Sequence, residues 1–216
     1  MPRVDFDPDE IGARAFYKLL TASVLPRPIA WVSTRSAAGV DNLAPHSFFT
    51  VACTDPPVLQ FTSIGRKDSL RNAEETGEFV VNFSPRGLFE RINATGTPFP
   101  AEVSEFAAVG LEPEPSERVA PFRVAESPVA FECKVADTLS FGNSTVVFGR
   151  VLLGVVSDDV LDGELPDVEK LQPMARLGKN EWSELGAVRR ITRIPAEEWP
   201  GHFDDAPADT WEPEQA

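Results

Sequence analysis

The sequence predicts a mainly β protein, in which an antiparallel barrel is covered by a few short helices. The longest regular segments have the alternating or β-branched composition of strands, whereas the segments with helical spacing are short. No internal repeat or linker divides the 216 residues, and this length suits one large domain with a hydrophobic core. An antiparallel barrel is the simplest packing that buries such strands with so few helices.

Six strands are expected, and prolines and polar turns mark their ends. Asp55-Pro56-Pro57 separates the second strand from the third, Pro85 follows the fourth, and Phe141-Gly142-Asn143-Ser144 turns the chain between the last two. The first two strands are expected to pair as a hairpin across residues 36–41. The six segments are 29–34, 42–53, 58–61, 78–83, 129–139 and 145–156.

The helices are expected at the N-terminus and between the strands. Residues 10–23 place apolar side chains at helical spacing. A second helix over 69–76 would take Asp68 or Ser69 as its N-cap and Gly77 at the C′ position, where a left-handed backbone is common. Two further short helices are expected at 87–94 and 102–109.

Composition limits the partners that the protein can have. The formal net charge of −14 disfavours nucleic acid and anionic membranes, because both require basic surface. No apolar run of about 18 residues is present, so no membrane span is expected. The acidic N-terminus lacks the apolar segment of a secretory signal. We expect a single domain over 1–216, with a core over about 15–195 and a solvated acidic tail over 196–216.

Cysteine and histidine usage favours a reducing compartment and no metal site. Cys53 and Cys133 are too few and too far apart for a disulfide framework, so we interpret both as reduced and mostly buried, in a cytoplasmic protein. His46 and His202 are the two histidines. We interpret each as a surface or satisfied polar residue, and we predict no catalytic side chain and no metal ligand.

One loop has the sequence features of an anion site. Three of the chain's 20 lysines and arginines fall within six residues of a strongly acidic chain, beside several hydroxyl side chains. The loop lies between a strand and a helix, where free N–H groups and the helix dipole favour anions. It therefore suits a phosphate monoester; the alternative is a polar loop with solvated cations. Its polar residues are Thr62, Ser63, Arg66, Lys67, Asp68, Ser69 and Arg71.

A second segment, residues 42–49, could contact a flat heteroaromatic ring. Pro45 lies inside an expected strand, and proline cannot pair with strands on both sides, so we expect an edge or a bulge with free backbone groups. The alternative is an ordinary irregular strand. The motifs G-x-x-x-x-G-K-[ST], G-x-G-x-x-G and G-x-S-x-G are absent, so a P-loop, a Rossmann phosphate site and a nucleophile elbow are not expected.

Taken in order, these segments resemble the flavin reductase-like, FMN-binding split-barrel family that includes flavoredoxin. The resemblance covers about residues 15–195. Its early motifs are Pro-Arg-Pro-Ile-Ala from Pro26, Asn-Leu-Ala-Pro-x-Ser-Phe-Phe from Asn42, Asp-Pro-Pro from Asp55, Lys-Asp-Ser from Lys67 and Glu-Glu-Thr-Gly-Glu-Phe-Val-Val-Asn from Glu74. Its later motifs are Phe106–Leu111, Val124–Cys133 and Pro173–Gly178.

The resemblance implies a Greek-key split β-barrel, usually a homodimer, with FMN rather than FAD near the subunit interface. The chain departs from the family's pattern at His46, where a small or aromatic residue is common, and at Trp182, where tyrosine is common. The implied phosphate contacts are Thr62, Ser63, Arg66, Lys67, Asp68 and Ser69. The implied contacts to the ring or ribityl chain are Arg27, Ser33, Thr34, Asn42, Ala44, Pro45, His46 and Ser47.

The activity that the resemblance implies is flavin chemistry. NAD(P)H would donate hydride to the flavin, and the reduced flavin would pass electrons to a monooxygenase or another acceptor, while the protein supplies position and hydrogen bonds. Two alternatives stay open. One is an FMN electron carrier that does not oxidise NAD(P)H itself, and the other is a non-redox barrel that binds a different phosphate ligand.

Overall fold

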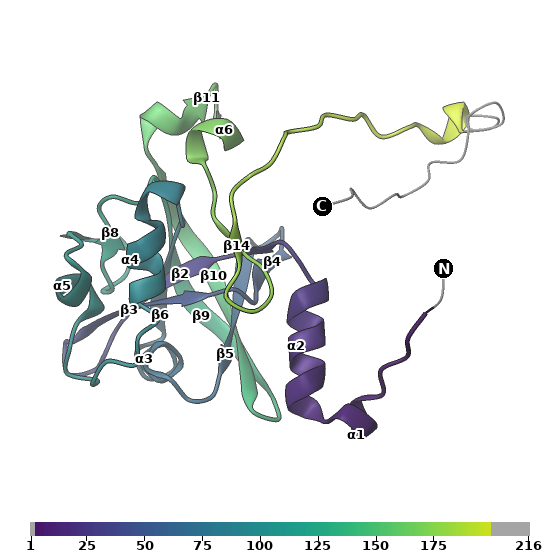
Figure 1. The fold of residues 1–216 in the computed structure, drawn as a ribbon. Coiled ribbons are helices and arrows are strands. Elements are labelled where there is room, and N and C mark those ends of the chain that lie inside the picture. Colours follow the sequence, from purple (N-terminus) through teal and green to yellow (C-terminus); the bar gives the residue numbers. More distant parts are fainter. Residues whose placement is uncertain (1–2, 200–216) are drawn as a thin grey trace. The chain divides into compact units, whose positions relative to one another are not determined.

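An antiparallel seven-stranded sheet organises the protein (Figure 1), and its strand order is β3-β2-β6-β9-β10-β5-β4. The computed structural model describes residues 3–199. The strands of this sheet are β2 (Ala30–Arg35), β3 (Asp41–His46), β4 (Phe49–Cys53), β5 (Val58–Ile64), β6 (Glu78–Asn82), β9 (Val129–Phe141) and β10 (Ser144–Val156). The prediction of a mainly β fold with a few short helices is confirmed.

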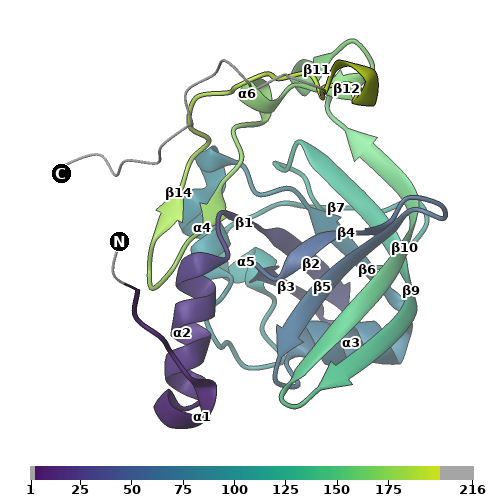
Figure 2. The same cartoon turned by 90° about the vertical axis from the view of Figure 1, so that its right-hand side faces the viewer.

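The sheet curls, because its two edge strands follow each other in the chain. Strands β3 and β4 stand at opposite ends of the strand order, yet only Ser47 and Phe48 separate them. Next to this junction, the Thr62 amide donates a hydrogen bond of 2.9 Å to the Phe48 carbonyl oxygen. The strands therefore curve around a shared interior (Figure 2). Pro45 lies in the edge strand β3, opposite Trp31 of β2, as its missing N–H group led us to expect.

Two apolar clusters pack on the two faces of β2. Ala30 and Val32 belong to one cluster with residues of β5, β6, β9 and β10, whereas Trp31 belongs to another with Leu43 and residues of two helices. Alternate side chains of a strand point to opposite faces, so a stretch of strand that is covered on both faces can be apolar at every residue. This explains why the first three residues of β2, Ala30, Trp31 and Val32, are all apolar.

The strand predictions are confirmed in position and corrected in two places. The predicted strand over 42–53 is two strands, since the chain crosses from one edge of the sheet to the other at residues 47–48. The predicted strand over 58–61 extends to Ile64, because its pairing with β10 continues to the Ser144–Ile64 pair. The predicted hairpin of the first two strands is confirmed as β2 and β3.

The helices are short, as predicted. The predicted helix over 10–23 is two helices over 8–11 and 13–23, which meet at Gly12, whose φ of 77° interrupts the helical backbone. Gly77 has the predicted left-handed conformation at the end of α3. The predicted cap was wrong, since Lys67 occupies the N-cap position of α3 without a side-chain hydrogen bond. The helices are α1 (Pro8–Ile11), α2 (Ala13–Ser23), α3 (Asp68–Thr76), α4 (Phe89–Ala94), α5 (Glu105–Val109) and α6 (Val168–Leu171), with 3₁₀ turns η1 (Arg86–Leu88) and η2 (Asp158–Val160).

The remaining strands are two-residue pairings that the sequence did not predict. They form small sheets apart from the main one, in the orders β1-β13-β14, β11-β12 and β7-β8. Their bounds are β1 (Arg27–Pro28), β7 (Pro113–Glu114), β8 (Arg123–Val124), β11 (Leu161–Asp162), β12 (Leu165–Pro166), β13 (Ala175–Arg176) and β14 (Trp182–Ser183).

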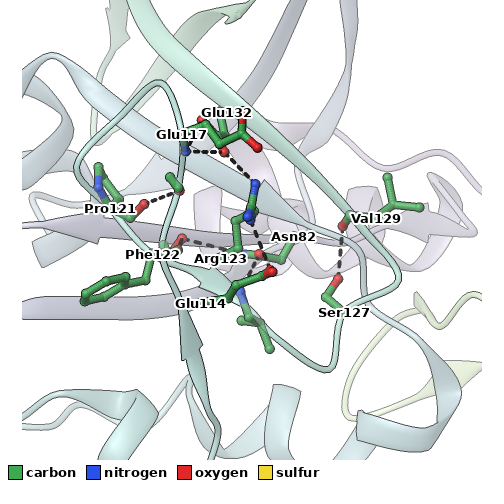
Figure 3. A network of polar contacts seen from close by, with 12 residues as sticks. Asn82, Glu114, Glu117, Pro121, Phe122, Arg123, Ser127, Val129 and Glu132 are labelled. Atoms are coloured by element: carbon green, nitrogen blue, oxygen red, sulfur yellow. Dashed lines mark hydrogen bonds and ion pairs between the residues drawn. The ribbon is translucent and has the colours of Figure 1, made fainter. Parts of the chain in front are cut away.

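A buried ion pair fixes the long segment before β9 (Figure 3). Glu132 of β9 is fully buried and accepts hydrogen bonds from the Arg123 guanidinium at 2.9 Å and from the backbone amides of Glu117 and Arg118 at 3.0 and 2.6 Å. Asn82 accepts a further bond of 2.9 Å from the Val124 amide. These donors offset the free-energy cost of burying the Glu132 carboxylate, and their hydrogen bonds tie the segment to the sheet.

Residues from Gly186 onward belong to a second unit, which is described by itself. Its described part, residues 186–199, contains η3 (Ala196–Glu198) and no strand. Most of the predicted acidic tail over 196–216, including His202, lies outside the described residues.

Both cysteines are free, but only one is buried. Cys133 lies in the core, where burial raises the pKa of its thiol to about 12. Cys53 is exposed, so the expectation that both are mostly buried was wrong for this residue; it is the last residue of the edge strand β4, in which residues 50–53 are exposed. No helix among residues 3–199 is long and apolar enough to cross a membrane.

Candidate functional site

A cavity of about 440 Å³ lies where the two edges of the sheet meet. This volume falls within the usual range of ligand pockets. Three segments surround it, namely β3 with the residues that follow it, the end of β5 with the start of α3, and the chain after α4. All of these segments belong to the first unit of the chain.

The structure brings ten of the fourteen predicted site residues to this cavity. They come from two segments that are separated in sequence by β4 and most of β5. The ten are Asn42, Ala44, Pro45, His46, Ser47, Thr62, Arg66, Lys67, Asp68 and Ser69.

The other four predicted residues do not line the cavity. Arg27 is buried, and its guanidinium donates to the carbonyl oxygens of Thr21, Val24 and Leu177 at 2.6, 2.7 and 2.6 Å. Ser33 donates its hydroxyl to the Phe122 carbonyl at 2.5 Å. These bonds tie separate segments together, so both side chains are occupied by structural contacts.

Thr34 supports the cavity indirectly, through a chain of hydrogen bonds. Its hydroxyl oxygen accepts from the side-chain amides of Asn42 and Asn72, each at 3.1 Å. The Asn42 amide also donates to the Ser69 hydroxyl oxygen at 3.1 Å. Ser69 is thereby held as an acceptor toward Asn42, which leaves its own proton available for a ligand. Ser63, by contrast, uses its proton on the Gly65 carbonyl at 2.9 Å.

The cationic residues of the loop differ in whether they form an ion pair. The Arg66 guanidinium pairs with Glu74, and Arg71 pairs with Asp68. Lys67 forms no ion pair with any residue between 3 and 199. Since α3 has no side-chain cap, its first N–H groups are also available. Lys67, the Ser69 hydroxyl and the start of α3 are therefore the groups of this loop that could hold an anion.

His46 contributes a neutral imidazole to the cavity wall. Burial lowers the pKa of His46 from 6.5 to about 4, so the ring is uncharged at neutral pH. Its Nδ1 atom lies 3.3 Å from the Thr62 carbonyl oxygen. Its Nε2 atom is buried and has no hydrogen-bond partner among the described residues.

The third wall was missed by the sequence analysis. It consists of residues 95–99 and Glu105. Thr95 is fixed by the Trp31 indole, which donates to its hydroxyl at 2.8 Å, and the Glu105 carboxylate accepts from the Leu43 amide at 2.9 Å. Burial raises the pKa of Glu105. The signal available in the sequence was the expected helix over 102–109, which places Glu105 beside the core residue Phe106.

The cavity wall combines polar and apolar groups. Besides the polar groups at the start of α3, Tyr17, Pro45, Phe48, Pro98 and Phe99 line the cavity and add apolar surface. A ligand with an anionic group and a flat apolar part matches this composition. No cluster of three or more potential metal ligands occurs among residues 3–199.

Comparisons with known proteins show which family the chain belongs to. The family model of the flavin reductase like domain matches residues 22–170. An uncharacterised protein of Aquifex aeolicus is 42% identical over 181 residues, which cover 81% of this chain and 92% of that protein.

Two solved structures are also similar to this chain. The structure of nitrilotriacetate monooxygenase component B from Bacillus cereus has a TM-score of 0.86 and 31% identity, covering 88% of this chain and 100% of that one. The structure of the Pseudomonas fluorescens 2-nitrobenzoate 2-nitroreductase NbaA has a TM-score of 0.83 and 31% identity, covering 89% and 97%. Since the family model covers more than half of the chain, the resemblance seen in the sequence is confirmed, and the protein belongs to the flavin reductase-like family.

Proposed function

We propose that the cavity binds FMN and that the protein is an NAD(P)H-dependent flavin oxidoreductase. The observation that carries the proposal is that one cavity combines apolar walls with a helix start that lacks a side-chain cap and with a lysine that forms no ion pair within residues 3–199. A phosphate monoester fits the first part, and an isoalloxazine ring fits the second. FMN ends in such a monoester, whereas FAD does not, so we favour FMN.

The residues divide into direct and supporting roles. Lys67, Ser69 and the first N–H groups of α3 would hold the phosphate, with Thr62 and Arg66 beside them. Asp68 lines the same end, where its pairing with Arg71 offsets its charge. Backbone groups of residues 44–47 would contact the ring. Four other residues would not contact the flavin themselves, but their hydrogen bonds would position the segments that do. These residues are Arg27, Ser33, Thr34 and Ser63.

The bound flavin would supply the redox chemistry, by accepting hydride from the nicotinamide and passing electrons on. The chain's own residues bind, orient and shield it. No general base is required of them, which is compatible with a neutral, buried His46. The nitrilotriacetate monooxygenase relative suggests a monooxygenase as one class of electron acceptor.

We also propose a Greek-key split barrel, a single catalytic domain, and a homodimer in the cytoplasm. The curled sheet and its adjoining edges support the barrel. Exposed apolar side chains in α2 and just after it support the dimer: Tyr17, Leu20, Val24 and Leu25 are between 45% and 61% exposed. Because Tyr17 also lines the cavity, a partner on this face would lie next to the flavin. Sedimentation analysis of the wild type and of Leu20→Glu tests the dimer, which the substitution should dissociate.

The absorbance spectrum of the purified protein tests the proposed function. We expect flavin absorbance as purified or after addition of FMN, and anaerobic bleaching by NADH or NADPH. A protein that stays colourless in excess FMN would overturn the proposal. A protein that binds FMN but is not bleached by either nucleotide would be an electron carrier. Binding of simple phosphate esters without FMN binding would instead indicate a non-redox phosphate-binding protein.

A further inference from the structure

The buried carboxyl group of Glu105 has no cationic partner among residues 3–199. The residue is 6% exposed and lines the cavity. None of the ion pairs in this part of the chain includes Glu105. Its hydrogen-bond donors are two backbone amides, that of Leu43 at 2.9 Å and its own. Buried acids are usually paired with a cation, so Glu105 has acceptor capacity that the fold does not use.

Glu132 shows how this fold satisfies a buried carboxylate that has a structural role. It accepts from the Arg123 guanidinium and from two backbone amides, and it does not line the cavity. Glu105 has no such guanidinium, and it borders the cavity. Unlike Nε2 of His46, neither carboxyl oxygen of Glu105 is enclosed without a partner. A further donor for Glu105 can therefore come from the molecule that occupies the cavity.

The chemistry of the carboxyl group restricts which part of a ligand it can meet. In either protonation state it offers an oxygen that accepts a hydrogen bond. Phosphate oxygens repel an ionised carboxylate, whereas hydroxyl groups donate to it. Burial raises the pKa of Glu105, and the charge of Asp68 raises it further. Since Asp68 is the first residue of α3, this influence places Glu105 near the proposed phosphate site. The hydroxyls nearest the phosphate are therefore the matching part of the ligand.

We propose that Glu105 is a specificity residue whose carboxyl oxygen accepts a hydrogen bond from a hydroxyl of the ligand's polyol chain. The inference rests on the proposed binding of FMN, whose ribityl chain is such a polyol. It gives the third wall of the cavity a direct contact to the ligand, whereas the family motifs assigned such contacts only to residues between 27 and 69. The cavity would thereby prefer a flavin phosphate with a hydroxylated chain over one with an alkyl chain of the same length.

The test is a cycle of two ligands and two proteins. Fluorescence titration gives the affinities for FMN and for an FMN analogue with a pentyl chain in place of ribityl. The wild type should bind FMN about 10- to 100-fold more tightly than the analogue. Glu105→Met, which removes the acceptor at similar length, should weaken FMN binding by about the same factor and change binding of the analogue much less. Equal affinity of the wild type for the two ligands would overturn the inference without any variant.

Matched variants make the outcome specific. Glu105→Gln keeps an acceptor oxygen and should recover part of the affinity for FMN. Glu102→Met removes an exposed carboxylate three residues away, outside the cavity, and should bind both ligands like the wild type.

Two further ligands separate the hydroxyls from the other groups of FMN. Riboflavin has the hydroxyls without the phosphate, so Glu105→Met should weaken its binding as well. An effect confined to FMN would show that Glu105 acts on the phosphate, and the inference would fall. FMN methylated at the ring imide N3 should keep the dependence on Glu105; if the dependence vanishes with this ligand, the donor is the ring imide and the hydroxyl assignment is wrong.

Failure of this inference is distinguishable from failure of the proposed function. If the wild type does not bind FMN, the proposed function falls and this inference with it. If the wild type binds FMN, and Glu105→Met lowers the affinity for FMN and for the pentyl analogue by the same factor, Glu105 acts only through the Leu43 amide that it holds. In that case only the specificity role of Glu105 is overturned.

Discussion

The buried histidine should make the stability of the protein depend on pH in a predictable window. His46 has a pKa of about 4 in the folded state, against 6.5 for an exposed histidine. Between these values the unfolded chain binds a proton that the folded chain does not. Protonation therefore favours unfolding, and the free energy of unfolding rises with pH across this window.

The magnitude follows from the two pKa values. Their difference of 2.5 between 6.5 and about 4, at 1.36 kcal/mol for each pH unit, gives about 3 kcal/mol. This stability is fully present above pH 6.5 and is lost as the pH falls toward 4. Because the ring is almost completely buried, solvent screening should reduce the effect little.

Urea unfolding at closely spaced pH values from 4.5 to 7 measures the effect. Acidic residues titrate in the lower part of this range, so the informative quantity is the difference in slope between the wild type and His46→Phe. We expect the wild type to show a slope steeper by up to about 1.4 kcal/mol per pH unit. His202→Gln, which removes the other histidine, serves as the matched control and should resemble the wild type. Equal slopes in the wild type and His46→Phe would refute the reasoning.

Three further predictions concern other parts of the structure. Lys67→Ala should weaken FMN binding by about 10- to 100-fold, since a charge-assisted hydrogen bond contributes roughly 1.5–3 kcal/mol; calorimetric titration should show little change for Lys134→Ala, which removes an exposed lysine outside the cavity. Glu132→Ala should destabilise the fold by about 3–5 kcal/mol in urea unfolding, because it leaves the Nη1 group of the buried Arg123 and the Glu117 and Arg118 amides without their acceptor; a change below about 1 kcal/mol would contradict this. Gly149→Ala should lower stability by about 1–3 kcal/mol, because the added Cβ would lie 2.1 Å from the Phe79 ring; an unchanged thermal midpoint would show that the ring moves at little cost.

Much of the fold was predictable, because strand composition is a local property of the sequence. The long hairpin of β9 and β10 was found almost to the residue. The break between β3 and β4 was missed, since it depends on which edge of the sheet each strand joins, and that is decided by pairing partners far away in the chain. The cap of α3 was also missed: the structure starts the helix one residue earlier than expected, so Asp68 enters its first turn.

The candidate site was partly predictable for a related reason. The cationic loop and the strand with Pro45 each have a distinctive local composition, and the curled sheet brings them together. The third wall has no such signal. Its position depends on the hydrogen bond from Trp31 to Thr95, which joins residues 64 positions apart in the sequence.

The two-residue junction between β3 and β4 has a consequence for how the protein opens. Strands at sheet edges have the fewest hydrogen bonds and are among the first to exchange their amide protons. A ligand in the cavity contacts β3 on one side and the β5 end on the other, so it holds these elements together. At a concentration 100 times its Kd, such a ligand suppresses local opening by about 2.7 kcal/mol. The protein without ligand would then be the form most exposed to proteases and edge-to-edge association, and the supply of flavin would set its lifetime in the cell.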